Sequence, residues 1–143
     1  MSIKSVLLAA AIAATATVPA TAQYGGRMLS ADLRGNAEVP GPGKLDASGS
    51  ATVRINPGQN RLCYTLSSMR IPRATIAHIH SGRAGVAGPP VVTLRAPSNG
   101  RIAECVPVAR TLARAMLTNP RAFYVNIHSE AFPTGAVRGQ LRR

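Results

Sequence analysis

The three histidines of the chain are the side chains most able to do chemistry. His78 and His80 are separated by one residue, and His128 lies in a second, distant segment. Residues two apart in an extended strand project from the same face, so His78 and His80 share a face that lies opposite their apolar neighbours. Groups of three neutral imidazoles bind copper or zinc and leave a further position open. The spacing therefore predicts a pair of ligands that a third histidine could complete.

The segment that contains His128 has the same alternation. Residues 123–129 place Val125 and Ile127 in an apolar row and Asn126 and His128 in a polar row. We therefore expect the three imidazoles to meet outside the apolar interior, as a candidate mononuclear site for copper or zinc. A metal-free alternative stays open, in which the first two histidines hydrogen-bond to loop groups. Glu104 and Glu130 are candidates to orient an imidazole.

Short strands separated by turn residues must position these histidines. A helical pattern of apolar residues covers only residues 108–118, with Val108, Leu112, Ala115 and Met116 on one face. The predicted fold class is all-β, an antiparallel Greek-key β-sandwich or flattened barrel with one short helix, of the immunoglobulin-like or superoxide-dismutase-like kind. Seven segments are predicted to be strands: 28–34, 51–56, 61–67, 75–80, 91–94, 123–129 and 136–141.

The two cysteines predict one disulfide. Cys63 and Cys105 can pair in only one way, and an oxidising compartment favours the bond. Cys63 alternates with apolar neighbours in its strand, so we expect it on the outer face of the sheet. In that position it would tether a crossing loop.

The first residues have the composition of a cleaved export signal. Residues 1–22 contain a basic start at Lys4, an apolar run and a small-residue site at residues 20–22, which predicts a signal peptide. The run is too short to span a bilayer. We expect an N-terminal extension at 23–28, one domain at 29–141, and a secreted or periplasmic protein that is not transmembrane.

The chain is strongly basic. It has 17 Lys and Arg against 5 Asp and Glu, a net charge of +12. Such a surface attracts polyanions, and for an exported protein we expect anionic envelope polymers or a lipid surface. Nucleic acid is not expected as a partner, because the arginines are scattered and aromatic residues do not interleave with them. The sequence carries no information on oligomeric state.

Four blocks of the sequence resemble the CHRD domain, the module first described in chordin. They are residues 37–40 (AEVP), 77–82 (AHIHSG) with the glycines and prolines up to residue 92, 124–128 (YVNIH) and 133–141 (PTGAVRGQL). The resemblance extends over residues 29–141. It implies an exported, mostly β domain of binding or envelope-associated type, and it implies no particular reaction.

A more remote resemblance bears on chemistry. Copper-zinc superoxide dismutases also place a His-x-His pair, a late third histidine and a following arginine in the order of His78, His80, His128 and Arg138. This implies copper, with Arg138 as an anion guide if the protein is an enzyme. The chain has no further histidine, so it lacks a bridging imidazole and a zinc site. We therefore favour a binding or envelope-associated protein with a candidate copper site over an enzyme, and keep as alternatives a copper-dependent oxidoreductase of the superoxide-dismutase kind and a metal-free interaction module.

Overall fold

The computed structural model describes residues 26–143, and these form a single antiparallel sheet with one α-helix. The expected signal peptide at 1–22 lies outside the described residues, as do residues 23–25 of the extension that follows it. The strands are β1 (Arg27–Arg34), β2 (Ser48–Asn56), β3 (Arg61–Met69), β4 (Ala74–Ser81), β5 (Pro90–Leu94), β6 (Arg101–Pro107), β7 (Phe123–Ser129) and β8 (Phe132–Gln140).

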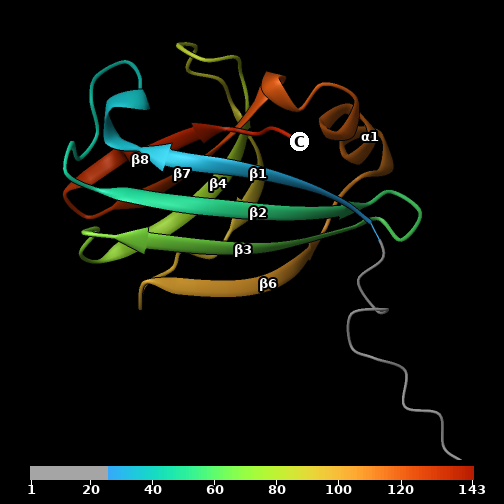
Figure 1. Cartoon of the computed structure of the whole chain (residues 1–143), viewed down its shortest axis with the longest axis horizontal. Helices are drawn as coiled ribbons and strands as arrows, with labels where there is room; N and C mark the ends of the chain where they lie inside the picture. The colour runs from blue at the N-terminus through green and yellow to red at the C-terminus, as the bar shows by residue number, and fades with distance from the viewer. Residues whose placement is uncertain (1–25) are drawn as a thin grey trace, which may run out of the picture.

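The sheet folds over on itself into two layers (Figure 1). Its strand order is β5-β4-β7-β8-β1-β2-β3-β6, so the two edge strands, β5 and β6, follow each other in the chain. The layers join where β8 meets β1, through the register pair Arg34–Arg138 and a bridge between Ser30 and Arg142. The predicted all-β architecture, a sandwich or flattened barrel, is confirmed.

Alternation along the strands builds the core between the layers. In β3, the buried Leu62 and Leu66 alternate with partly exposed residues, and in β4 Ala77 and Ile79 have no exposed surface. Burying each large aliphatic side chain stabilises the fold by about 2 kcal/mol. The histidines of β4 lie on the opposite, outer side of their strand from this core.

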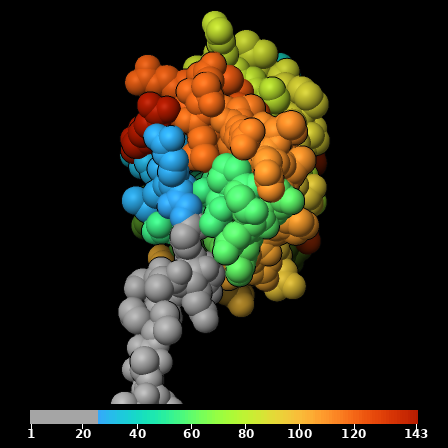
Figure 2. Space-filling view, turned by 90° about the vertical axis from the view of Figure 1, so that its right-hand side faces the viewer, coloured from blue at the N-terminus to red at the C-terminus, as the bar shows by residue number. Residues whose placement is uncertain are grey.

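Helix α1 (Arg110–Thr118) is shorter than predicted and turns a slightly different face inward. Val108 continues the strand-like pairing instead, since its N–H donates to Asn60 O at 2.9 Å. Ala115 is exposed, and the buried residues are Ala113, Met116 and Leu117. The helix lies beside the β2–β3 turn at one end of the molecule (Figure 2). None of the helices within residues 26–143 has the length and apolar character needed to cross a bilayer.

Strand β6 is absent from the sequence prediction, and its presence changes the role of the disulfide. The Cys63–Cys105 bond forms as predicted, but Cys105 lies directly opposite Cys63 on a neighbouring strand, with 3.9 Å between the Cα atoms. It therefore joins two strands, and the expectation that it tethers a loop is wrong. The alternation of apolar and polar residues in the sequence of β6 is weak. The row of side chains that faces the core includes Glu104, which lies opposite Tyr64, as well as apolar residues.

Candidate metal centre

The structure brings the three histidines together on the outer face of β4 and β7. In the antiparallel register, His78 lies opposite Asn126 and His80 opposite Tyr124, which puts His128 within reach of both rings. One ring nitrogen from each histidine lies within 4.8 Å of the other two. The closest pair is His78 Nδ1 and His128 Nε2, at 3.0 Å. At these separations, small side-chain rotations can bring the three nitrogens onto one ion.

The polar face is not open to solvent as alternation alone would suggest. His80 and His128 are each only 9% exposed. The glycine-rich loop, residues 82–89, folds back against the end of β4 and contacts His80 through Gly88, whereas the ring of His128 contacts Pro133 of β8. The start of the loop is fixed by Gly82 N–H, which donates to Ala122 O at 2.8 Å, and its end by Pro89 O, which accepts from Ser81 N–H at 3.0 Å.

Backbone carbonyls set the tautomers of two rings. His80 Nδ1 lies 2.7 Å from Gly88 O, and His128 Nδ1 lies 2.8 Å from Pro133 O. A carbonyl oxygen can only accept, so both Nδ1 atoms carry a proton and donate it. In the neutral ring, each Nε2 then presents a lone pair toward the cluster. A ligating histidine is commonly oriented in this way, by a second hydrogen bond from its far nitrogen. The expectation that Glu104 or Glu130 does this is wrong, because those acids are paired with Arg95 and Arg73.

Asn126 is a fourth polar group at the same point. Its Oδ1 lies 3.1 Å from both His80 Nε2 and His128 Nε2. With the oxygen in that position, Asn126 Oδ1 and the two Nε2 atoms are all acceptors, and no proton lies between the oxygen and either ring. A cation bound among them would relieve the repulsion between their lone pairs. With the amide turned round, its NH₂ group would instead bridge the two rings. Asn126 is 2% exposed, so one of the two arrangements must satisfy it.

Burial favours the neutral, ligating form of the β4 histidines. It lowers the pKa of His78, and the neighbouring rings of His128 and His80 lower it further. Burial also lowers the pKa of His80, although its hydrogen bonds to Gly88 and Asn126 act in the opposite direction. Deprotonated imidazoles are the form that a metal needs.

Tyr124 and Arg138 support the loop from beneath. The ring of Tyr124 stacks on His80 with centroids 4.7 Å apart, and the guanidinium carbon of Arg138 lies 3.4 Å from the Tyr124 centroid. Arg138 Nη2 donates to the carbonyls of Arg83 and Val86 at 2.8 and 2.9 Å. Arg138 is 1% exposed, so its charge holds the glycine-rich loop.

Glu38 adds a buried carboxyl on the same side of β8. It lies against Gly135, and its Oε1 has no hydrogen-bond partner among the described residues. Burial raises the pKa of Glu38 from 4.5 to about 7, although the charge of Arg138 and the backbone N–H of Val39 lower it. Near neutral pH the folded chain therefore holds a proton on Glu38 that the unfolded chain has lost.

This proton predicts a specific pH dependence of stability. The contribution of the protonated Glu38 is complete below pH 4.5 and is lost as the pH rises through about 7. In urea denaturation, the free energy of unfolding of the wild type relative to Glu38→Gln should fall over that range by on the order of 2 kcal/mol. His78 and His80 are present in both proteins, so their contributions to the pH dependence cancel in the difference. Gly41→Ala, which changes no titratable group and adds a methyl group where nothing lies within 4 Å, should show a flat difference. A flat difference for Glu38→Gln would contradict the assignment.

Comparison with known proteins assigns the family. The model of the CHRD domain matches residues 29–141, and the chain belongs to this family. No curated protein and no solved structure shows a significant match to the chain.

Sequence reasoning brought His78, His80 and His128 together but did not assign a role to three neighbours. Asn126 and Tyr124 share the polar row of His128, which is a signal that could have identified them. Glu38 carries no such signal, because it reaches the site from a distant loop after β1.

Proposed function

We propose that this CHRD-domain protein is an exported metal-binding protein whose histidine cluster, His78, His80 and His128, holds one copper ion. The observation that carries the proposal is the convergence of two Nε2 lone pairs, fixed by the hydrogen bonds from His80 to Gly88 O and from His128 to Pro133 O. A third nitrogen and the Asn126 oxygen lie beside them. Imidazole nitrogens suit copper and zinc, and copper is favoured by the order of divalent affinities.

Retention of copper through desalting tests the proposal. Metal-depleted protein incubated with Cu²⁺ should keep about one equivalent, with nitrogen couplings in its electron paramagnetic resonance spectrum, and His80→Ala should keep close to none. Thr93→Ala is a matched control, because Thr93 is an exposed neighbour of His78 on β5 that offers no imidazole. Parallel loading with Zn²⁺ should give weaker retention. Equal retention by His80→Ala, or none by the wild type, would contradict the site and leave the metal-free arrangement with Asn126 bridging the rings.

An oxidoreductase remains the second candidate, with Arg138 as its anion guide. The burial of Arg138 and its bonds to two loop carbonyls weigh against this role. The absence of a bridging imidazole in the sequence also removes an obvious proton carrier. Copper-loaded protein is therefore expected to dismutate superoxide no faster than the same concentration of free copper. Faster turnover would favour the enzyme.

Export and anionic partners complete the proposal. The N-terminal sequence and the disulfide support a secreted or periplasmic location. Four of the five acids are in ion pairs with basic side chains, and the fifth, Glu38, is buried. The remaining surface charge is therefore positive, which suits anionic envelope polymers. The family assignment is compatible with a metal-free interaction module, which the copper experiment distinguishes.

A further inference from the structure

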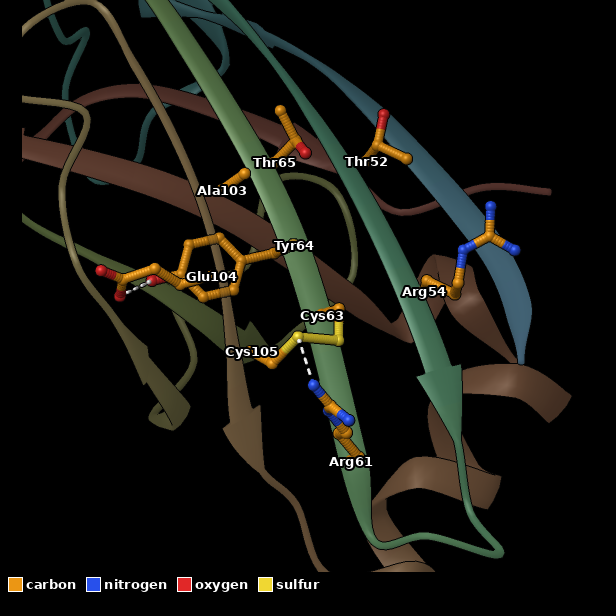
Figure 3. A pocket seen from close by; sticks show the side chains of 9 residues that line it. All are labelled: Thr52, Arg54, Arg61, Cys63, Tyr64, Thr65, Ala103, Glu104 and Cys105. Atoms are coloured by element: carbon orange, nitrogen blue, oxygen red, sulfur yellow. Dashed lines mark hydrogen bonds between the residues drawn. A yellow bond between two sulfur atoms is a disulfide. The ribbon is translucent and has the colours of Figure 1, made fainter. Parts of the chain in front are cut away.

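A groove on the far layer of the sandwich contains the disulfide. It runs over the outer face of β2, β3 and β6 (Figure 3), whereas the histidines lie on β4 and β7. Cys63 is half-buried and Cys105 is exposed, and both line this groove, so a small reagent can reach the sulfurs. An external thiol can attack a disulfide at such a position, whereas it cannot reach a disulfide in the core.

One arginine contacts the disulfide directly. Arg61 Nη2 donates to Cys105 Sγ at 3.4 Å, and Figure 3 shows its side chain extending along β3 to the sulfur. Arg54, on β2, lines the same groove, but its guanidinium is turned away from the sulfurs. The two sulfurs are therefore not equivalent, since among residues 26–143 a hydrogen bond from a cation is seen at the sulfur of Cys105 and not at that of Cys63.

The one acid of the groove is already engaged. Glu104 pairs with Arg95 at 2.9 Å and accepts a hydrogen bond from Tyr64 Oη at 3.2 Å. Its charge is thus compensated by Arg95, and the field at the sulfurs is that of the arginines. A cation in contact with a cysteine sulfur stabilises the thiolate. A thiolate that is stabilised is also the better leaving group in disulfide exchange.

We propose that Cys63–Cys105 is a reversible thiol–disulfide exchange site, at which an external low-molecular-weight thiol attacks Cys63 and Cys105 departs. The thiolate of the reagent forms a bond to Cys63 Sγ, and the Cys63–Cys105 bond breaks, with its electron pair leaving on Cys105 Sγ beside Arg61. A second thiol molecule then attacks the mixed disulfide. It releases Cys63 as a thiol, so that two reagent thiols are oxidised to one disulfide and the protein gains two electrons and two protons.

The sheet keeps the two cysteines in place when the bond is open. Strands β3 and β6 are paired continuously from Arg61–Pro107 to Ser67–Arg101, and β3 is paired along its whole length with β2. The register therefore does not depend on the disulfide alone. The two sulfurs stay opposite each other, so an oxidant can close the bond again.

Reduction rates of two arginine variants test the role of Arg61. The intact disulfide is reduced by 2-mercaptoethanol in the presence of a metal chelator, and the released thiol is followed with time. Arg61→Gln should slow reduction by about fivefold, because the departing thiolate loses its hydrogen bond. Arg54→Gln removes the same charge from the same groove without touching a sulfur, and it should change the rate less than about twofold. Equal effects of the two substitutions, or no effect of Arg61→Gln, would overturn the proposal.

The position of the mixed disulfide gives an independent test. A brief reaction of the wild type is stopped with iodoacetamide, and trypsin then separates Cys63, in residues 62–70, from Cys105, in residues 102–110. The proposal expects the 2-mercaptoethanol adduct on the first peptide and the alkylated thiol on the second. The opposite distribution, or an even one, would contradict Cys105 as the leaving group. Circular dichroism of the reduced protein should show the same β-sheet signal as the oxidised protein, and loss of that signal would contradict reversibility.

Discussion

Gly88→Ala is expected to weaken copper binding by about 10- to 100-fold, the usual cost of disturbing a group that orients a metal ligand. Gly88 lies where the glycine-rich loop packs against Ser81 at the end of β4, and a Cβ added there would stand 1.6 Å from Ser81 O. The nearest atoms all belong to the backbone of Ser81 and Gly82, so no side chain can move aside to make room. The loop must therefore lift, and Gly88 O then leaves His80 Nδ1, which it now contacts at 2.7 Å. His80 loses the bond that fixes its tautomer.

Competition with a chromophoric copper chelator measures this effect. Gly41→Ala is the matched control, because it adds the same methyl group where nothing lies within 4 Å. It should bind copper as the wild type does. Amide hydrogen exchange in residues 82–89 provides a second readout, which should accelerate in Gly88→Ala even without metal. If Gly88→Ala kept its copper affinity while its amide exchange accelerated, the loop would not orient His80. If its amide exchange stayed unchanged, the loop would not have lifted.

Arg138→Met should lower the free energy of unfolding by about 3 kcal/mol, since it removes a buried cation and leaves its partners unpaired. The carbonyls of Arg83 and Val86 would lose their donor, and the Tyr124 ring would lose the guanidinium that packs on it. Glu38 would also lose the charge that lowers its pKa. Methionine fills a similar volume, so the loss reflects polar contacts more than a cavity.

Urea denaturation of metal-free protein measures this loss. Arg83→Gln is the control, because Arg83 is exposed and contributes its backbone carbonyl, which the substitution keeps. It should cost less than about 0.5 kcal/mol. Arg138→Lys retains the charge but cannot make the same pair of bonds, and it should fall between the two. A loss below about 1 kcal/mol for Arg138→Met would contradict the role given to Arg138.

Much of the fold could be predicted because alternation is a local property. Val53 and Ile55, for example, point inward because every second residue of β2 does, and no tertiary information is needed to see it. Strand β6 was missed for the converse reason. None of its residues is fully buried, and its place beside β3 depends on residues 95–100, which carry the chain from one edge of the sheet to the other.

The candidate site was likewise predictable from the sequence only in part. The meeting of His78, His80 and His128 follows from two strand patterns and the pairing of β4 with β7. The carbonyls that set the tautomers do not, because any residue can supply a backbone oxygen. Strand alternation also did not predict that the two histidines are buried, since His80 is contacted by Gly88 of the loop and His128 by Pro133 of β8.

Strand β8 lies between β7 and β1, which makes the last strand of the chain the link between the two layers. During synthesis from the N-terminus, β1, β2 and β3 can form a local meander early, but the sheet stays in two pieces until β8 emerges. Pairing of the first strand with the last carries a large loop-closure entropy, which predicts slow folding for a chain of this size. Removal of the C-terminal strand would thus leave two half-sheets with newly exposed edges, prone to aggregation, and not a smaller version of the same protein.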